Sequence, residues 1–238
     1  MKVRWMMTSL MGAILLAGLS GRPARSASVP SSVHVCAVMH PKAGREAALR
    51  EALLALVGPT TQEAGNIAYE VFGQPDGTLI LHEAWRSQDV LNAHLARPNL
   101  VAFVARLPSL IEGTNDAHFG RLISSHSQVT SSGHAPAVNI CSFKHAKTGQ
   151  ENALRSALVA LSTPTAHEPG MVTYNIYQEE GGGLFLFEQW RSQSDLDAHF
   201  RTPYVRAFRK KADQLVDQNV IFSARPLEAS PPETVARP

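Results

Sequence analysis

Four kinds of side chain with acid–base or hydrogen-bonding chemistry recur in this sequence at matched positions. A glutamate stands two residues before a tryptophan, and a histidine follows that tryptophan after nine residues. A tyrosine precedes all three. The first set is Tyr69, Glu83, Trp85 and His94, and the second is Tyr174, Glu188, Trp190 and His199. Because the whole set recurs, it is the first candidate for a functional site.

Together these residues suit the oxidation of an electron-rich phenol or quinol by molecular oxygen. Such a substrate reacts with oxygen directly once it has lost a proton, so the protein must supply a base, a dry pocket and a path for oxygen. Histidine, with an ordinary pKa of about 6.5, is the natural base. The glutamate would orient the histidine or hold a substrate hydroxyl, and the tyrosine would donate a hydrogen bond to the developing oxyanion. The candidate catalytic residues are therefore His94, His199, Glu83 and Glu188, and the candidate substrate-binding residues are Trp85, Trp190, Tyr69 and Tyr174.

Each member of the set also has a structural interpretation. The tryptophans and tyrosines would pack in a core, because large aromatic side chains are usually well buried. The glutamates would pair with Arg86, Arg191 or a helix N-terminus, and the histidines would pack against Pro98 and Pro203. Both interpretations stay open from the residues alone.

Strand geometry predicts which of these side chains lie together. Alternate residues of a strand share a face, so Leu81, Glu83 and Trp85 point one way, and His82 and Ala84 point the other. A carboxylate beside a tryptophan and a leucine needs a partner. His94 follows in a short predicted helix and would approach Trp85 across the gap between helix and sheet. The set would then line one concave, mostly apolar pocket.

The two sets belong to two copies of one domain. Corresponding residues lie 105 positions apart, and no gap is needed between Cys36 and Leu110. The unit is longer than the ~20–50 residues of a solenoid repeat and has the size of a small domain. We therefore interpret the chain as a tandem duplication.

Both copies show the same order of predicted elements. Residue preferences and periodicity in the first copy predict strands over 33–39, 67–72, 78–85 and 118–123, and helices over 45–57, from Ser87 to about Ala96, and from Pro98 onwards. Gly58-Pro59 should stop the first helix, and Ser87 should cap the second. The resulting β-α-β-β-α-β order, with the second helical region broken in two, is the α+β ferredoxin-like pattern.

The predicted organisation has five parts. They are a signal peptide over 1–26, a first repeat over 33–123, a linker over 124–137, a second repeat over 138–224 and a disordered tail over 225–238. A ferredoxin-like sheet carries helices on one face only. We expect the two repeats to pack sheet to sheet as an intramolecular pseudo-dimer, and the linker would also permit a homo-oligomer with exchanged repeats.

The N-terminal segment has the pattern of a secretory signal peptide. Lys2 and Arg4 form a positive region, an apolar run follows over 6–19, and Ala24-Arg25-Ser26 supplies small residues for cleavage. The apolar run is shorter than the ~20 residues of a membrane span. We therefore expect a periplasmic or secreted protein that has no membrane attachment after cleavage.

The two cysteines, Cys36 and Cys141, occupy the same position in the two repeats. An oxidising compartment would allow a disulfide between them, but a disulfide requires Cα atoms within about 7 Å of each other. Central strands of two separate sheets are not expected to approach so closely. The sequence therefore favours two buried thiols that act as small apolar residues.

Composition excludes several classes of function. The formal net charge is +2 without a basic stripe, so no nucleic-acid partner is expected. The ten histidines show no His-x-x-x-His spacing and the cysteines no Cys-x-x-Cys, so no metal site is expected. Gly181-Gly182-Gly183 aligns with the hairpin turn Asp76-Gly77-Thr78 and is not a phosphate loop.

A known family shows the same combination of residues. The motifs are Lys42-x-Gly44 before the first helix, Gly65 and Tyr69 around the second strand, Glu83-x-Trp85 on the third, and Ala93-His94 followed by Pro98. They recur in both repeats and resemble the antibiotic biosynthesis monooxygenase domain of the dimeric α+β barrel superfamily. The resemblance implies a barrel built from two sheets and pockets between sheet and helices. Several members oxygenate quinols or polycyclic phenols with molecular oxygen and no cofactor, and the resemblance implies such an activity here.

Two rival functions remain beside the oxygenase. Family members without known activity leave open a non-enzymatic protein that binds a small aromatic ligand. A haem-degrading branch of the same fold uses an Asn, a Trp and a His around the porphyrin. Asn139 is suggestive of that branch, but its counterpart in the first repeat is His34, so the triad is not reproduced.

Overall fold

The computed structural model describes residues 32–128 and 136–227. The predicted signal peptide over 1–26 lies outside these residues, as does most of the predicted tail. No helix in the described ranges is long and apolar enough to span a bilayer.

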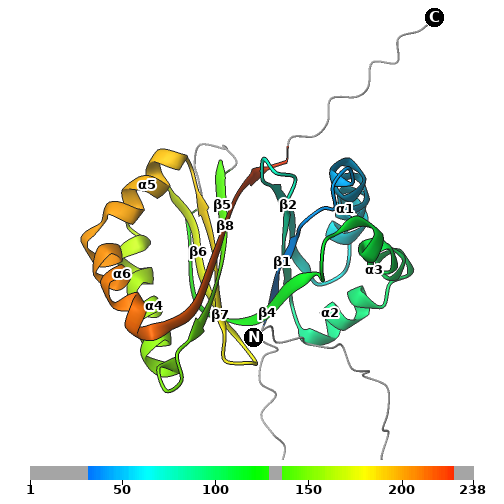
Figure 1. The fold of residues 1–238 in the computed structure, drawn as a ribbon. Coiled ribbons are helices and arrows are strands. Elements are labelled where there is room, and N and C mark those ends of the chain that lie inside the picture. The colour runs from blue at the N-terminus through cyan, green and yellow to red at the C-terminus, as the bar shows by residue number, and fades with distance from the viewer. Residues whose placement is uncertain (1–31, 129–135, 228–238) are drawn as a thin grey trace, which may run out of the picture.

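The two repeats have the same order of elements, as the sequence predicted (Figure 1). The first contains β1 (Val33–Met39), α1 (Glu46–Thr61), β2 (Asn66–Gly73), β3 (Leu79–Trp85), α2 (Gln88–Leu95), α3 (Pro98–Leu110) and β4 (Asp116–Ser127). The second contains β5 (Val138–Ala146), α4 (Glu151–Thr165), β6 (Met171–Glu179), β7 (Leu184–Trp190), α5 (Gln193–Arg201), α6 (Pro203–Leu215) and β8 (Val216–Pro226). Ser87 caps α2 as predicted, since its side chain accepts a hydrogen bond from the backbone N–H of Val90.

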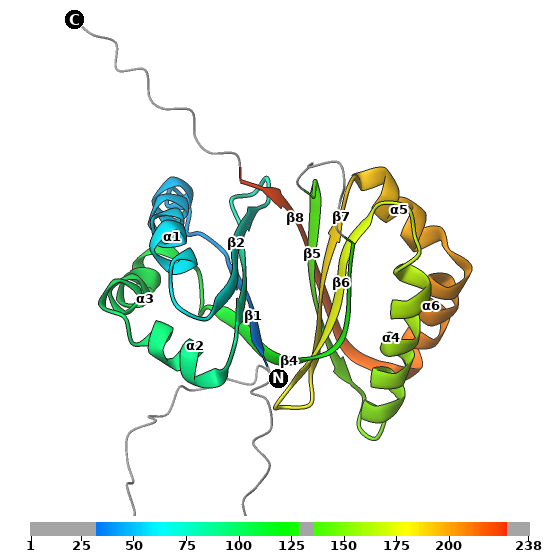
Figure 2. The ribbon, with the colours of Figure 1, turned by 180° about the vertical axis from the view of Figure 1, so that it is seen from behind.

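The strands close into one antiparallel barrel in the order β1-β3-β2-β8-β5-β7-β6-β4. The helices lie outside the barrel on its two opposite flanks (Figures 1 and 2). The ferredoxin-like repeats and the barrel between them are confirmed. Closure depends on two strands that cross between the repeats. β4 pairs with β1 and then with β6, and β8 pairs with β5 and, at its end, with β2.

These crossing strands extend beyond the predicted boundaries. Residues 124–127 were assigned to the linker, but they continue β4 and pair with β6 of the second repeat. Arg225 and Pro226 were assigned to the tail, but they end β8 and pair with Gly73 and Phe72. The sequence shows no apolar alternation there, because the pairing depends on backbone hydrogen bonds to the other repeat rather than on side-chain burial.

The first helix also runs further than predicted. Gly58-Pro59 was expected to end it, yet α1 continues to Thr61 with Pro59 inside. Pro59 lacks the N–H that would donate to residue 55 and crowds the carbonyl of that residue, but only two helical residues follow it, so the cost is confined to the last turn. The buried side chain of Thr60 then helps to anchor the last turn.

The central strands are buried on both faces, so each contributes to two cores. On β1, Val33, Val35, Ala37 and Met39 face the helices of the first repeat. Cys36 and Val38 face the barrel interior, where they meet residues of the second repeat. There His82 of β3 stacks on Phe187 of β7, with ring centroids 3.7 Å apart.

The interpretation of Cys36 and Cys141 as free thiols was wrong, because the two residues form a disulfide. Their Cα atoms lie 6.8 Å apart. The argument against a disulfide treated the first strands as members of two separate sheets. In the closed barrel both cysteines point into the interior, where these two strands lie opposite each other.

The disulfide should contribute strongly to stability. It joins residues 105 positions apart, and in the chain-entropy model a loop of about 100 residues corresponds to about 4.7 kcal/mol. We expect the Cys36→Ala/Cys141→Ala double variant to lose about 4 kcal/mol of unfolding free energy in urea titrations. Reductant should destabilise the wild type but not the double variant. A loss below about 1 kcal/mol would contradict this expectation.

Candidate active site

Alternation along two paired strands brings the predicted residues of the first repeat together. Glu83 and Trp85 lie on the face of β3 that is turned to the helices, as predicted from the period of two. Tyr69 of β2 is the direct cross-strand neighbour of Glu83. The Ser87 cap starts α2 so that Leu91 and His94 lie on its buried face. All four predicted residue types therefore meet between sheet and helices.

Trp85 fixes the Glu83 carboxylate. The Trp85 ring is fully buried, and its Nε1–H donates a 2.7 Å hydrogen bond to Glu83 Oε2. This bond supplies the partner that a buried carboxylate needs. The interaction with Arg86 that remained open from the sequence is not what holds Glu83.

His94 lies behind this pair and connects it to a second carboxylate. The centroids of the His94 and Trp85 rings are 4.4 Å apart, and His94 Nε2 lies 3.8 Å from Glu83 Oε2. Its Nδ1 lies 3.0 Å from Glu63 Oε1, and Arg97 Nε donates to Glu63 Oε2 at 2.8 Å. The result is a continuous series of charged and polar groups from the surface guanidinium of Arg97 to the buried indole of Trp85.

Sequence reasoning assigned no role to Glu63 or to its counterpart Glu168. Both lie in the turn after the first helix of their repeat, and both contact the site histidine. The available signal was their recurrence at the 105-residue offset, each 31 residues before its histidine.

Burial changes the acid–base behaviour of Glu83 and Tyr69. It raises the pKa of the Glu83 carboxyl, and the Trp85 hydrogen bond and the nearby His94 only partly offset this. Burial, with the charges of Glu83 and Glu63, also raises the pKa of Tyr69 above its ordinary value. Tyr69 therefore stays protonated, and Glu83 is a stronger base than an exposed carboxylate.

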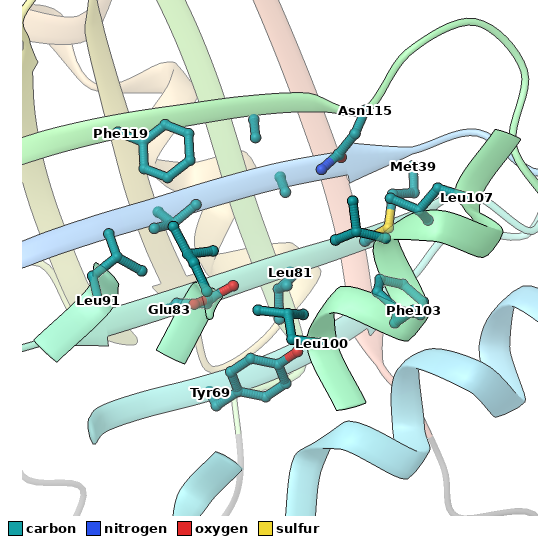
Figure 3. Close-up of a pocket in the computed structure, with 15 residues that line it drawn as sticks. Met39, Tyr69, Leu81, Glu83, Leu91, Leu100, Phe103, Leu107, Asn115 and Phe119 are labelled. Atoms are coloured by element: carbon teal, nitrogen blue, oxygen red, sulfur yellow. The ribbon is translucent and has the colours of Figure 1, made fainter. Parts of the chain in front are cut away.

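A cavity of about 80 Å³ opens beside Glu83, between the sheet and helices α2 and α3. Figure 3 shows Tyr69 and Glu83 among the side chains around it. The rest of its wall is mainly apolar and includes Ala37, Met39, Leu81, Leu100, Phe103 and Leu107. The Tyr69 hydroxyl is buried and has no hydrogen-bond partner among the described residues. Trp85 and His94 do not line the cavity, so Glu83 and Tyr69 are the members of the predicted set that a ligand would touch.

The second repeat reproduces the framework of this site. Trp190 Nε1 donates to Glu188 Oε2 at 3.1 Å, and His199 Nδ1 lies 2.7 Å from Glu168 Oε1. The centroids of the Trp190 and His199 rings are 4.7 Å apart, and Tyr174 is fully buried. The predicted residues thus come together in both repeats.

The surroundings of the two sites differ in charge. Lys144 occupies the position of Met39 and is buried, and its Nζ donates to Ser142 Oγ at 3.1 Å and to Asn219 Oδ1 at 2.9 Å. Burial lowers the pKa of Lys144 to about 8, although the Glu188 carboxylate opposes this. The apolar wall of the first repeat therefore has a polar, cationic counterpart in the second.

The remaining predictions concern cofactors. No group of three or more His, Cys, Asp or Glu residues within 32–128 and 136–227 is arranged to hold a metal ion. Asn139, the suggestive residue for haem, lies in the barrel interior and accepts a hydrogen bond from Gln189. It therefore lies on the opposite face of the sheet from Trp190 and His199, and the three cannot surround one porphyrin.

A family model and a curated relative both match this chain. A family model described as "Antibiotic biosynthesis monooxygenase" matches residues 32–106 and 136–211, once in each repeat. The "Putative monooxygenase Rv0793" of Mycobacterium tuberculosis is 39% identical over 70 residues, which make up 29% of this chain and 69% of that protein.

Solved structures share the two-repeat fold. The "Putative monooxygenase (FN1347)" of Fusobacterium nucleatum superposes with a TM-score of 0.73 over 84% of this chain and 94% of that one, at 12% identity. An "anthrone oxidase-like protein" gives a TM-score of 0.66 over 83% and 92%, at 13% identity. At these identities the likeness shows a common fold alone.

The raised pKa of Glu83 should make stability depend on pH. A carboxyl whose pKa is higher in the folded state favours folding while it is protonated, and this contribution is lost as the pH rises through the folded pKa. Glu83→Gln keeps an acceptor for Trp85 and removes the buried charge. We therefore expect this variant to be more stable than the wild type at pH 8, because it buries no charge at this position.

That advantage should disappear below the ordinary glutamate pKa of 4.5. Urea titrations of both proteins between pH 4 and pH 8 measure the difference directly. A wild type that is the more stable protein at pH 8 would contradict the direction of the shift.

Proposed function

The chain belongs to the antibiotic biosynthesis monooxygenase family, and from that membership we propose that it oxidises a quinol-like aromatic substrate with molecular oxygen and no cofactor. The first repeat is proposed as the active one. The observation that carries this is the cavity beside Glu83, where one carboxylate and one unpartnered tyrosine hydroxyl lie in an otherwise mainly apolar wall. A pocket of this kind suits a flat apolar ring that bears a hydroxyl group.

In the proposed reaction Glu83 accepts the proton of the substrate hydroxyl. Its burial makes it a stronger base than a surface glutamate. The Tyr69 hydroxyl then donates a hydrogen bond to the phenolate oxygen, which stabilises the anion. The electron-rich ring carbon forms a C–O bond with molecular oxygen, and the peroxide takes back the proton that Glu83 accepted. The C–H bond at that carbon and the O–O bond then break together, so that one oxygen atom stays on carbon as a carbonyl and the other leaves as water with the ring proton. The electrons come from the substrate itself.

His94 receives a supporting role in this proposal. The sequence favoured it as the base and Glu83 as the residue that orients it. The geometry supports the reverse arrangement, because Glu83 lines the cavity and His94 does not. With Nδ1 at Glu63 and Nε2 3.8 Å from Glu83, His94 is positioned to stabilise the glutamate charge.

The size of the cavity favours a single-ring substrate. A cavity of about 150 Å³ in another protein holds one benzene molecule, and the space beside Glu83 is about 80 Å³. Only part of a ring fits within it, so the rest of any substrate must lie at its mouth. A quinol leaves less of its ring system outside the cavity than a polycyclic phenol does, and we propose a quinol for this reason.

We also propose that the protein works outside the cytoplasm. The Cys36–Cys141 disulfide supports this, because such bonds persist mainly in oxidising compartments. The pattern of the first 26 residues points the same way. Cell fractionation tests the proposal, and recovery of the chain in the cytosol alone would contradict it.

Oxygen uptake by the purified chain with a panel of quinols and anthrones tests the activity. We expect uptake without added flavin, metal or haem, and a loss of kcat of about 10²-fold or more in Glu83→Gln, the size typical of a general base. Glu188→Gln is the matched variant of the second repeat. A similar loss in both variants would contradict the assignment to the first repeat, and no uptake with any substrate would favour the non-enzymatic ligand-binding protein.

The pH profile provides an independent check on the base. Since Glu83 must be deprotonated and its pKa is raised, kcat/KM should fall on the acidic side with a midpoint above 4.5. In Glu83→Gln the residual kcat/KM should no longer fall on the acidic side of the pH profile. An unchanged acidic limb in the variant would assign the base to another residue.

A further inference from the structure

The mouth of the cavity in the first repeat is apolar and open to solvent. Leu95 of α2, Val104 of α3 and Phe119 of β4 all line the cavity. Their side chains are 44%, 48% and 44% exposed. We call these three residues the apolar mouth. They are three of the eight large hydrophobic residues that are exposed within the described residues, and all three line one cavity.

The fold itself does not require this surface. The corresponding positions of the second repeat hold Phe200, Arg209 and Ser223. There the Arg209 guanidinium lies over the Phe200 ring, 4.9 Å from its centroid. The same scaffold therefore tolerates an arginine and a serine at two of the three positions, and a mouth that is apolar at all three is particular to the first repeat.

The apolar surface continues along α3 away from the cavity. Val101 is 53% exposed and lies three residues before Val104, so both side chains project from the same side of the helix. A ligand that leaves the cavity between α2 and α3 would meet apolar side chains over about one helical turn.

The interior and the mouth together define an amphiphilic ligand with its polar end inside. The hydroxyl acceptor and donor, Glu83 and Tyr69, lie within the cavity, which is too small for more than part of a ring. Whatever extends outward lies on Leu95, Val104 and Phe119 and gains most if it is also apolar.

We propose that the ligand of the first repeat is a phenol or quinol with an alkyl chain, the ring hydroxyl directed to Glu83 and Tyr69 and the chain lying on the apolar mouth. The oxidation of this ligand rests on the function proposed above, whereas its binding does not. Burial of one methylene group is worth about 0.8 kcal/mol, which is about a fourfold gain in affinity. Partial burial at an open mouth should give about threefold per methylene until the mouth is covered.

Calorimetric titration with 4-alkylphenols tests the proposal without turnover. The series runs from 4-methylphenol to 4-octylphenol, below the concentrations at which the longer members aggregate. For the wild-type chain we expect Kd to fall about threefold per methylene from methyl to about hexyl and then to level off. An affinity that does not depend on chain length would overturn the proposal.

A variant of the mouth locates the effect. In Leu95→Ser/Val104→Arg/Phe119→Ser even 4-methylphenol should bind more weakly than to wild type, because part of its ring lies at the mouth, and the gain in affinity per methylene should disappear. All three side chains are exposed, and an unchanged urea midpoint would confirm that the variant is folded. Val104→Arg alone provides a milder variant. Val220→Ser is the matched control, because Val220 is also 44% exposed but does not line the cavity. A triple variant that keeps the full gain per methylene would overturn the proposal.

Oxygen uptake with alkylhydroquinones of the same chain lengths separates the two proposals. Chain-dependent binding without uptake would refute the oxygenase and leave the ligand class standing. Uptake whose kcat/KM does not change with chain length would refute the ligand class and leave the oxygenase standing.

Discussion

The burial of β1, β3, β5 and β7 on both faces is the constraint on which the rest of the structure depends. A strand between a barrel interior and a layer of helices has no solvated side, so each polar side chain on it must find its partner inside the protein. On β3 this produces two separate arrangements within four residues. Glu83 accepts from Trp85 on the helix side, and His82 contacts Glu70 on the barrel side. The candidate site is thus the helix-side solution to a requirement that burial on both faces of the strand imposes.

Local sequence signals predicted the elements and much of the site. The period of two on β3 placed Glu83 beside Trp85, and the Ser87 cap placed His94 above them. These features depend on neighbours within a few residues, so a single sequence contains them. The role of Glu63 was not predicted, because its contact with His94 spans 31 residues and depends on how α1 packs.

Contacts between the repeats could not be predicted in the same way. Whether Cys36 meets Cys141, and whether residues 124–127 form a strand, depends on how one sheet faces the other. The periodicity that identifies each repeat is the same for two separate sheets and for a closed barrel. The volume of the cavity, and the fact that Glu83 lines it whereas His94 does not, likewise follow from packing, which the residue types alone do not determine.

Two pairs of corresponding residues, Cys36 with Cys141 and His82 with Phe187, contact each other in the barrel interior, so they lie on the approximate twofold axis that relates the repeats. In a true homodimer a residue on such an axis meets its own copy, and the two side chains are necessarily identical. Covalent fusion removes this restriction. An imidazole can then stack on a phenyl ring where symmetry would impose two imidazoles or two phenyl rings. The same asymmetry allows one half to carry an apolar cavity while the other buries a lysine, which no symmetric pair of single-repeat chains can do.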